Sequence, residues 1–262
     1  MRYDAKSGIT IMLIDTNVKF MQHFSSFLKQ RLQWNFILEK EGPHALFTAE
    51  KEPVHMFLME TKLNPNCNGF KTLELIKNNA KLSKIPAAFV SSMKDKDTIS
   101  RARTLGIENY LFKPIDSEEV FKTIIHAILK TVKFQFLVVD NDESVFPIVE
   151  QIISKKFQFQ YKIFTTTSAL TGFNILDEQE INLLILGNNM PTVNGVRMLT
   201  MLQERGKLST LPVIFAPDEL TGEERFKVAE LELEYFLEKP FQAEEFISTV
   251  NKALNIKPLP SL

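Results

Sequence analysis

The sequence repeats itself at an interval close to half of its 262 residues. Residues 10–15 (TIMLID) match residues 136–140 (FLVVD), and from Pro65 onward the matches keep a constant offset of 126. Because chance similarity does not hold one register over so many positions, the repeat predicts two copies of one smaller domain. The positions that set the register are Pro65 with Pro191, Gly69 with Gly195, Pro86 with Pro212, and Lys113 with Lys239.

Short apolar runs alternate with segments of helical periodicity in each copy. Val18, Met21, Phe24 and Leu28, for example, recur every three or four residues, as one face of a helix does. The alternation predicts βαβ units, with a parallel sheet that is covered by helices on both faces. We expect strands at residues 10–14, 36–40, 54–59, 85–90 and 109–112 in the first copy, and at 135–139, 159–164, 181–186, 211–216 and 234–237 in the second.

The predicted fold class is therefore α/β, with two tandem flavodoxin-like (βα)5 domains. Each domain is expected to be a doubly wound parallel sheet of strand order 2-1-3-4-5, whose functional edge is the carboxyl end of the strands. We place the domains at residues 8–131 and 132–257. Because no Gly/Pro-rich linker lies between them, we expect the two domains to be closely coupled.

Composition narrows the classes of function. A run of about 18 apolar residues is missing, as is a secretory signal, so we expect a cytoplasmic protein without membrane insertion. The net charge of −1 gives no general attraction to nucleic acid. Residues 1–131 carry a net +5 and residues 132–262 a net −6. This polarity either steers partners or reflects two solvated surfaces of unequal composition.

The cysteine and histidine residues indicate neither a disulfide nor a metal site. Cys67 is the single cysteine, and we expect it to be an incidental loop or packing residue. The four histidines have no fixed spacing, which argues against a metal site or a phosphotransfer histidine. His126 lies in an apolar helical segment and is expected to be packed.

The ends of the predicted strands carry a combination of residues that resembles the receiver domain of bacterial two-component response regulators. An acidic residue follows the first strand of each copy, Met-Pro-Thr-Val-Asn-Gly (190–195) follows the third strand of the second copy, and Lys-Pro follows the fifth strand of both. The resemblance extends over nearly the whole of each copy. It implies an aspartate after the third strand that accepts a phosphoryl group, Mg²⁺ held by the acids, and Lys and Ser/Thr side chains that bind the phosphoryl oxygens.

Carried over to the first copy, the resemblance leaves the identity of the phosphoacceptor position open. The apolar run of the third strand puts Glu60 there, whereas counting back from Pro65 and Gly69 puts Thr61 there. We prefer Glu60, because a one-residue insertion in the following loop is easily tolerated. Neither residue is an aspartate. The residues carried over at the other strand ends are Asp15, Thr16 in place of a second acid, Ser91 and Lys113.

The second copy departs further from the family pattern. Asp140 is followed by Asn141, and Gly187 occupies the acceptor position, where it offers no side chain to phosphorylate. Pro217 stands where a hydroxyl is expected, and Lys239 is retained. Since each copy lacks its full set of carboxylates, we expect Mg²⁺ binding to be lost or weak, and we predict no metal site and no cofactor.

Both lysines are expected to form ion pairs with carboxylates of the chain although the phosphoacceptor aspartate is missing. Lys113 is expected to pair with Glu60 and Asp15, and Lys239 with Asp140. Glu60 is then either a structural partner of Lys113 or a fixed mimic of the phosphoryl charge, and we favour the structural role.

These departures predict two pseudo-receivers that bind other signalling proteins, a second copy of the chain included, without phosphorylation and without enzymatic activity. The resemblance places the contact faces near the fourth and fifth strands, where Tyr110 and Phe236 hold the family's switch-aromatic position. Both residues also fit plain core packing. Two alternatives stay open, namely a response regulator with atypical phosphorylation and a small-ligand sensor that uses a crevice at the strand ends.

Overall fold

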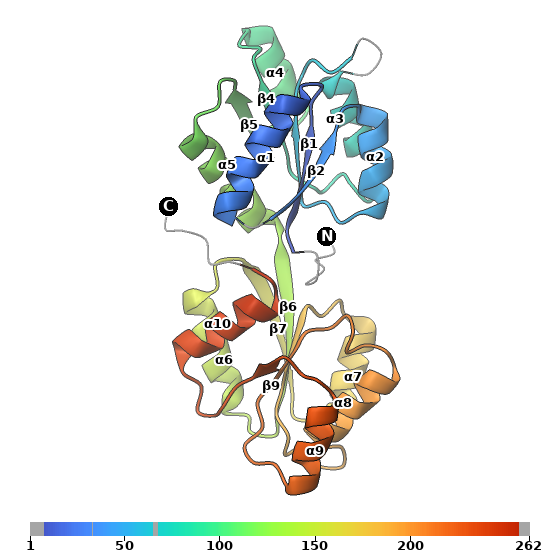
Figure 1. Cartoon of the computed structure of the whole chain (residues 1–262), viewed down its shortest axis with the longest axis vertical. Coiled ribbons are helices and arrows are strands. Elements are labelled where there is room, and N and C mark those ends of the chain that lie inside the picture. Colours follow the sequence, from blue (N-terminus) through green and yellow to red (C-terminus); the bar gives the residue numbers. More distant parts are fainter. Residues whose placement is uncertain (1–7, 33, 65–67, 257–262) are drawn as a thin grey trace. The chain divides into compact units, whose positions relative to one another are not determined.

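The computed structural model describes residues 8–32, 34–64 and 68–256, so that Pro65 and Cys67 lie outside the described residues. The chain divides into two compact units between Val132 and Lys133 (Figure 1), which we call unit 1 and unit 2. Each unit is an α/β domain with one five-stranded sheet. Within the described residues, no helix is long and apolar enough to cross a membrane.

Unit 1 is a parallel sheet of strand order β2-β1-β3-β4-β5, which confirms the predicted order. Every residue of β1 and β3 is buried, because helices cover both faces of these central strands. The elements are β1 (Thr10–Ile14), α1 (Val18–Leu32), β2 (Asn35–Glu39), α2 (Gly42–Lys51), β3 (Met56–Met59), α3 (Gly69–Asn78), β4 (Ala87–Ser91), α4 (Lys96–Thr104), β5 (Asn109–Phe112) and α5 (Ser117–Thr131).

Unit 2 repeats the architecture, with the strand order β7-β6-β8-β9-β10. All ten predicted strands of the chain are therefore present, and β6 and β7 are longer than expected because they pair from Lys133↔Gln160 to Val139↔Thr166. The elements are β6 (Lys133–Val139), α6 (Val145–Lys156), β7 (Gln160–Thr166), α7 (Ala169–Glu178), β8 (Leu183–Leu186), α8 (Gly195–Glu204), β9 (Val213–Phe215), α9 (Gly222–Glu230), β10 (Tyr235–Phe236) and α10 (Ala243–Ala253).

Apolar burial on both faces of each sheet fixes the helices in place. In unit 2, Leu184 of β8 packs in one cluster with Phe173 of α7, Leu199 of α8 and Val228 of α9, which are all buried. Helices α6 and α10 contact each other, as the cartoon also shows (Figure 1). Because these strands are parallel, the carboxyl ends of β6, β8, β9 and β10 lie at one edge of the sheet.

The last helices of the two units end differently. Helix α5 begins after Asp116, whose carboxylate accepts the N–H groups of Glu118 and Glu119. At the offset of 126, the end of α10 at Ala253 corresponds to a position inside α5, which continues to Thr131. Helix α10 is thus about one turn shorter, and Asn255 (φ 49°) turns the chain away from the helical course.

The histidine that is buried in unit 1 is not the one that the sequence indicated. His126 is exposed on α5, so the expectation that it packs into the core is wrong. His55 is instead fully buried, and its Nδ1 accepts the N–H of Thr10 at 3.0 Å. Burial lowers the pKa of His55 from 6.5 to about 4, because the charged imidazolium would lose its hydration there.

Candidate functional site

Lys113 joins the ends of three strands in unit 1. It follows β5, and its Nζ lies 2.5 Å from Asp15 Oδ2 after β1 and 2.8 Å from Glu60 Oε2 after β3. The ring of Phe20 lies 4.1 Å below the same ammonium. The carboxylates of Asp15 and Glu60 are only 6% and 9% exposed, so the ammonium is their counter-charge in a setting with little water.

The second carboxylate oxygen of Glu60 is held by its neighbour Thr61. Glu60 Oε1 accepts the backbone N–H of Thr61 at 2.7 Å and the Thr61 hydroxyl at 3.0 Å. Because the single hydroxyl proton of Thr61 goes to this carboxylate, Ser91 Oγ must donate to Thr61 Oγ1 across 2.6 Å. Burial alone would raise the pKa of the Glu60 carboxyl, but Lys113 and the Ser91 and Thr61 hydroxyls outweigh it and hold the pKa below its ordinary value.

Glu60 and Gly187 occupy the same place in their respective units. Each follows the central strand β3 or β8 and donates its backbone N–H, at 2.9 Å, to the last residue of β1 or β6. Each also has a glycine packed onto its carbonyl oxygen, Gly69 on Glu60 and Gly195 on Gly187, where an added Cβ would overlap that oxygen. The loop that leads to this glycine is one residue longer in unit 1, and Thr61 corresponds to the residue after Gly187.

The corresponding lysine of unit 2 also pairs with carboxylates. Lys239 Nζ lies 2.5 Å from Asp140 Oδ2 and 3.3 Å from Asp218 Oδ1. Asp140 is buried, whereas Asp218 is half exposed and accepts a hydrogen bond from the Asn189 amide at 3.3 Å. Asp218 therefore supplies a second acid that the family pattern did not indicate.

The carboxylate of Asp140 fills the space beside Gly187. A Cβ added at Gly187 would overlap Asp140 Oδ2, and the other oxygen of that carboxylate accepts the Asp142 N–H at 3.0 Å. Lys239 and the Asp142 N–H hold the carboxylate from two sides. The position at which the resemblance expects a phosphorylated side chain is thus occupied by the first-strand acid.

Three of the expected site residues stand apart from these contacts. Thr16 and Asn141 directly follow Asp15 and Asp140, but both are exposed to solvent. Pro217 lies two residues after the end of β9 at Phe215 and offers no hydroxyl. The structure therefore brings together Asp15, Glu60, Thr61, Ser91 and Lys113 in unit 1, and Asp140, Gly187 and Lys239 in unit 2.

Glu224 is a further residue of the strand-end region that the sequence did not reveal. Its Oε1 accepts the amides of Asn188 at 3.1 Å and Asn194 at 2.8 Å, both from the loop after β8. Its Oε2 accepts the N–H and hydroxyl of Thr221, which completes a capping box at the start of α9. The Thr-x-x-Glu spacing could have predicted the cap, but the tie to the neighbouring loop has no local signal.

The Mg²⁺ that the resemblance implies does not fit this donor set. Mg²⁺ requires several free oxygen ligands in near-octahedral geometry, whereas Lys113 already engages one oxygen each of Asp15 and Glu60. In unit 2 the ammonium of Lys239 is placed in the same way against Asp140 and Asp218. In the part of the chain that the structure describes, no three His, Cys, Asp or Glu side chains gather as a metal site.

The two switch-aromatic positions differ between the units. Tyr110 is partly buried against Phe89, and its hydroxyl donates to the Met93 carbonyl at 2.9 Å. Phe236 lacks a hydroxyl and is 47% exposed, although its ring edge contacts Phe215. The alternative role of a core-packing residue therefore does not apply to Phe236.

Comparison with known proteins places both units in one family. Residues 11–125 and 136–251 each match the family model described as the response regulator receiver domain. The probable transcriptional regulator ycf29 of Pyropia yezoensis is 24% identical over 121 residues, which are 46% of this chain and 53% of that protein. Protein PilG of Pseudomonas aeruginosa is 26% identical over 117 residues, 45% of this chain and 85% of PilG. The chain thus spans about half the length of the ycf29 relatives that it matches.

Comparison with solved structures gives further similar proteins. A putative two-component system response regulator/GGDEF domain protein aligns over 94% of this chain and 98% of its own, with a TM-score of 0.44 and 16% identity. The chemotaxis response regulator CheY4 of Vibrio cholerae aligns over 46% of this chain and 98% of its own, with a TM-score of 0.42 and 16% identity. Since the family model matches well over half of the sequence, the chain belongs to the response regulator receiver domain family and carries two such domains in tandem.

Proposed function

We propose that the chain is an adaptor that binds other signalling proteins without being phosphorylated and without catalysing a reaction. The observation that carries this proposal is the pairing of Lys113 and Lys239 with carboxylates of the chain itself. The resemblance to the receiver family implies that the equivalent lysine binds the phosphoryl oxygens. Here both lysines are neutralised within their own unit, which favours one fixed conformation.

The acceptor positions support the same proposal. Gly187 has no nucleophilic atom in a side chain, and the adjacent Asp140 carboxylate is engaged by Lys239. Glu60 is ionised and held by Lys113 and Thr61, so we assign it a structural role rather than that of a phosphoryl mimic. A carboxylate that is held by an ammonium and two donors is a poor nucleophile.

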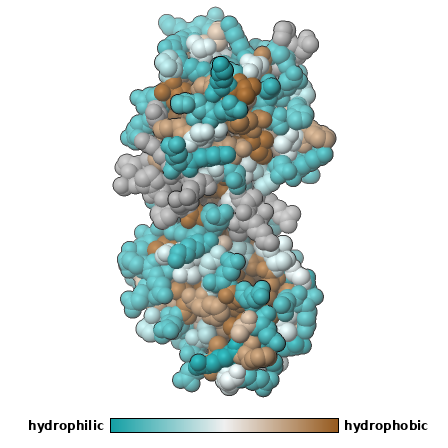
Figure 2. Space-filling model, in the orientation of Figure 1, coloured by the Kyte–Doolittle hydropathy of each residue, from teal (hydrophilic) through white to brown (hydrophobic). Residues whose placement is uncertain are grey.

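The surface around α9, β10 and α10 of unit 2 is the proposed contact face. Residues 218–245 carry ten Asp or Glu and only three Lys or Arg, whereas the corresponding residues 92–119 of unit 1 carry six and five. Phe226 of α9 is 67% exposed within this acidic segment, and Phe236 of β10 is also exposed. Figure 2 shows apolar side chains gathered on this side of unit 2, among hydrophilic ones.

An exposed aromatic residue within acidic surroundings favours a basic partner with an apolar recess. Interfaces are enriched in aromatic residues, and complementary charge raises the rate of association and excludes wrong partners. At the position that corresponds to Phe226, unit 1 has Ser100. The two units therefore offer different surfaces at the same elements, and we propose that unit 2 supplies the stronger contact.

Capture of partners by the full chain from native extract tests the proposal, with binding of each captured protein then measured for purified components. Phe226→Ser, which installs the unit 1 residue, should weaken binding by about tenfold or more. Leu170→Ser removes another exposed apolar side chain, on α7, and should leave the affinity unchanged. Equal effects of both substitutions would refute the assignment of this face.

Incubation of the chain with acetyl phosphate and Mg²⁺ tests the independence from phosphorylation. Intact mass should show no acid-labile phosphoryl group on the wild-type chain, and partner affinity should be the same before and after treatment. Stoichiometric labelling, or a partner that binds only the treated chain, would contradict the proposal.

A further inference from the structure

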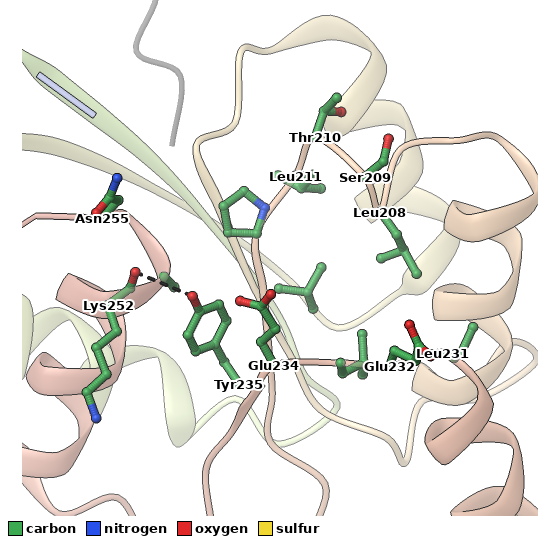
Figure 3. A pocket seen from close by; sticks show the side chains of 14 residues that line it. Leu208, Ser209, Thr210, Leu211, Leu231, Glu232, Glu234, Tyr235, Lys252 and Asn255 are labelled. Atoms are coloured by element: carbon green, nitrogen blue, oxygen red, sulfur yellow. Dashed lines mark hydrogen bonds between the residues drawn. The ribbon is translucent and has the colours of Figure 1, made fainter. Parts of the chain in front are cut away.

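A pocket of about 470 Å³ opens at the amino ends of β9 and β10, the edge of the sheet opposite to the lysine–carboxylate contacts (Figure 3). It is bounded by the loop before β9, by the turn between α9 and β10, and by the last turn of α10. A volume in this range accommodates a small organic molecule.

The early end of α10 helps to form this pocket. The helix ends at Ala253, and Asn255, which lines the pocket, turns the chain away at a positive φ. In unit 1 the corresponding helix continues for about another turn, to Thr131. The pocket therefore lies where a longer α10 would continue along the edge of the unit.

The lining of the pocket exposes somewhat more polar than apolar surface, and two exposed glutamates, Glu232 and Glu234, belong to it. Side chains of Leu208, Leu211, Leu231 and Leu233 line it, together with Pro212 and Ala253. Glu234 lies beside Tyr235 in the middle of the pocket, and the Tyr235 hydroxyl meets the Lys252 carbonyl at 3.5 Å (Figure 3). Burial, with the Glu234 carboxylate beside it, raises the pKa of this phenol, which therefore stays neutral.

The carboxylates of Glu232 and Glu234 have no counter-charge among the residues that the structure describes. Neither forms an ion pair there, and the Lys252 side chain extends away from both (Figure 3). The corresponding positions of unit 1 are Gly106 for Glu232 and Lys84 for Thr210, so that unit 2 has gained a carboxylate and lacks a cation. Glu232 is also held at φ 48°, a conformation that glycine adopts more readily.

We infer that this pocket binds a small organic cation, an amine or guanidine with an apolar body. The leucine side chains would cover the apolar part, while the carboxylates of Glu232 and Glu234 would bind the charged group through charge-assisted hydrogen bonds. The pocket shares residues 231–235 with the acidic segment of the proposed contact face, but Phe226 does not line it, so Phe226→Ser tests the protein contact apart from the pocket.

Titration of the isotope-labelled full chain with 2-phenylethylamine, followed by NMR, tests the inference. We expect saturable shifts at Leu208, Leu211, Leu233 and Tyr235 with a Kd of about 1 mM or below, which is reasonable for a ligand of this size. The neutral analogue 2-phenylethanol should bind about tenfold more weakly, and the anion phenylacetate more weakly still.

Two substitutions and a charge-matched control complete the experiment. Glu234→Gln should weaken binding about tenfold, and Glu232→Gly should weaken it severalfold without harming the fold, since glycine accommodates the positive φ. Glu230→Gln removes an exposed carboxylate of α9 that does not line the pocket, and should leave the affinity unchanged. Equal binding of the alcohol, shifts that do not saturate, or an equal loss in Glu230→Gln would overturn the inference.

Discussion

The carboxylate of Asp140 stands where the Cβ of any larger residue at position 187 would lie. Gly187 and Asp140 therefore depend on each other. Lys239 and the Asp142 N–H fix the carboxylate, so it cannot swing aside without losing both contacts. An aspartate at position 187 would place a second carboxylate beside Asp140 and Lys239, as Glu60 lies beside Asp15 and Lys113 in unit 1.

Gly187→Ala should destabilise unit 2 by about 1–3 kcal/mol, because the added methyl group overpacks the Asp140 carboxylate. The double substitution Gly187→Ala with Asp140→Ala should cost less than the sum of the two single substitutions, since the smaller side chain makes room. Hydrogen exchange of peptides from β6 and β8 measures the stability of unit 2 in the single and the double variants. Additive effects would show that the two positions are independent.

Lys113→Met should destabilise unit 1 by about 3–5 kcal/mol, because it leaves the buried carboxylates of Asp15 and Glu60 without a counter-charge. Glu60→Gln should lower the free energy of unfolding by less, because a neutral amide needs no counter-charge and Asp15 still pairs with Lys113. The chain's single tryptophan, Trp34, is buried in unit 1, so its fluorescence during urea denaturation follows this unit alone. A larger loss for Glu60→Gln, or a folded Glu60→Gln chain that no longer binds its partner, would contradict the structural role.

His55 should make unit 1 less stable as the pH falls from 6.5 to 4. The pKa of His55 is about 4 in the folded chain, below the ordinary 6.5, so the unfolded chain takes up the proton first. The free energy of unfolding of unit 1 is unaffected by His55 above pH 6.5. Between pH 6.5 and pH 4 it decreases by about 1.4 kcal/mol per pH unit. Trp34 fluorescence at pH 6.5 and pH 5 measures the slope before most carboxyl groups titrate. His55→Gln should remove this slope and the exposed control His126→Gln should keep it.

Glu224→Ala should loosen the start of α9. The substitution removes the acceptor for Asn188 and Asn194 together with the capping box to Thr221, and lost caps cost about 1 kcal/mol. Amide exchange at the first turn of α9 should speed up, as should exchange in the loop after β8. Glu223→Ala is the matched control, because this exposed neighbour pairs with Lys227 of its own helix and should leave that loop unchanged.

Glu232→Gly should stabilise unit 2 by about 0.5–1 kcal/mol, because it relieves a side chain at φ 48° even though glycine is more flexible in the unfolded chain. The reciprocal Gly106→Glu should destabilise unit 1, where the same turn has φ 76°. Urea denaturation, followed by hydrogen exchange for unit 2 and by Trp34 fluorescence for unit 1, gives both values. A loss of stability in Glu232→Gly would mean that the Glu232 side chain contributes more than its strain costs.

The repeat and the alternation of apolar runs with helical segments were sufficient to predict the fold. All ten strands and both sheet orders follow from them, because in a parallel sheet the apolar strand is buried on both faces whatever the chemistry at its end. Helix starts were predictable where a local cap exists, as at Asp116. His126 was misjudged because two isoleucines precede it, yet its own position faces the solvent.

Contacts between loops could not be predicted from the sequence. Glu224 lies 36 residues from Asn188, and Asp218 lies 29 residues from Asn189, so neither pair follows a helical or strand period. The choice between Glu60 and Thr61 also needed the backbone contact with Gly69, since the two units differ by one residue in that loop. Helix α10 ends at Ala253, and Asn255, which has a positive φ, is the residue type that closes a helix there when glycine does not, but a lone Asn is too weak a signal to place that end from the sequence.

The close approach of Gly69 and Gly195 to the preceding carbonyl oxygens separates two kinds of sequence similarity. Any side chain there would displace the backbone, so these glycines are required by the path of the chain whether or not a phosphoryl group is ever transferred. This backbone contact does not fix which residue occupies the acceptor position, since that residue is Glu60 in one unit and Gly187 in the other. In proteins of this kind, a matching glycine shows that the backbone follows the same path at this position. Only the residue at the acceptor position bears on the chemistry.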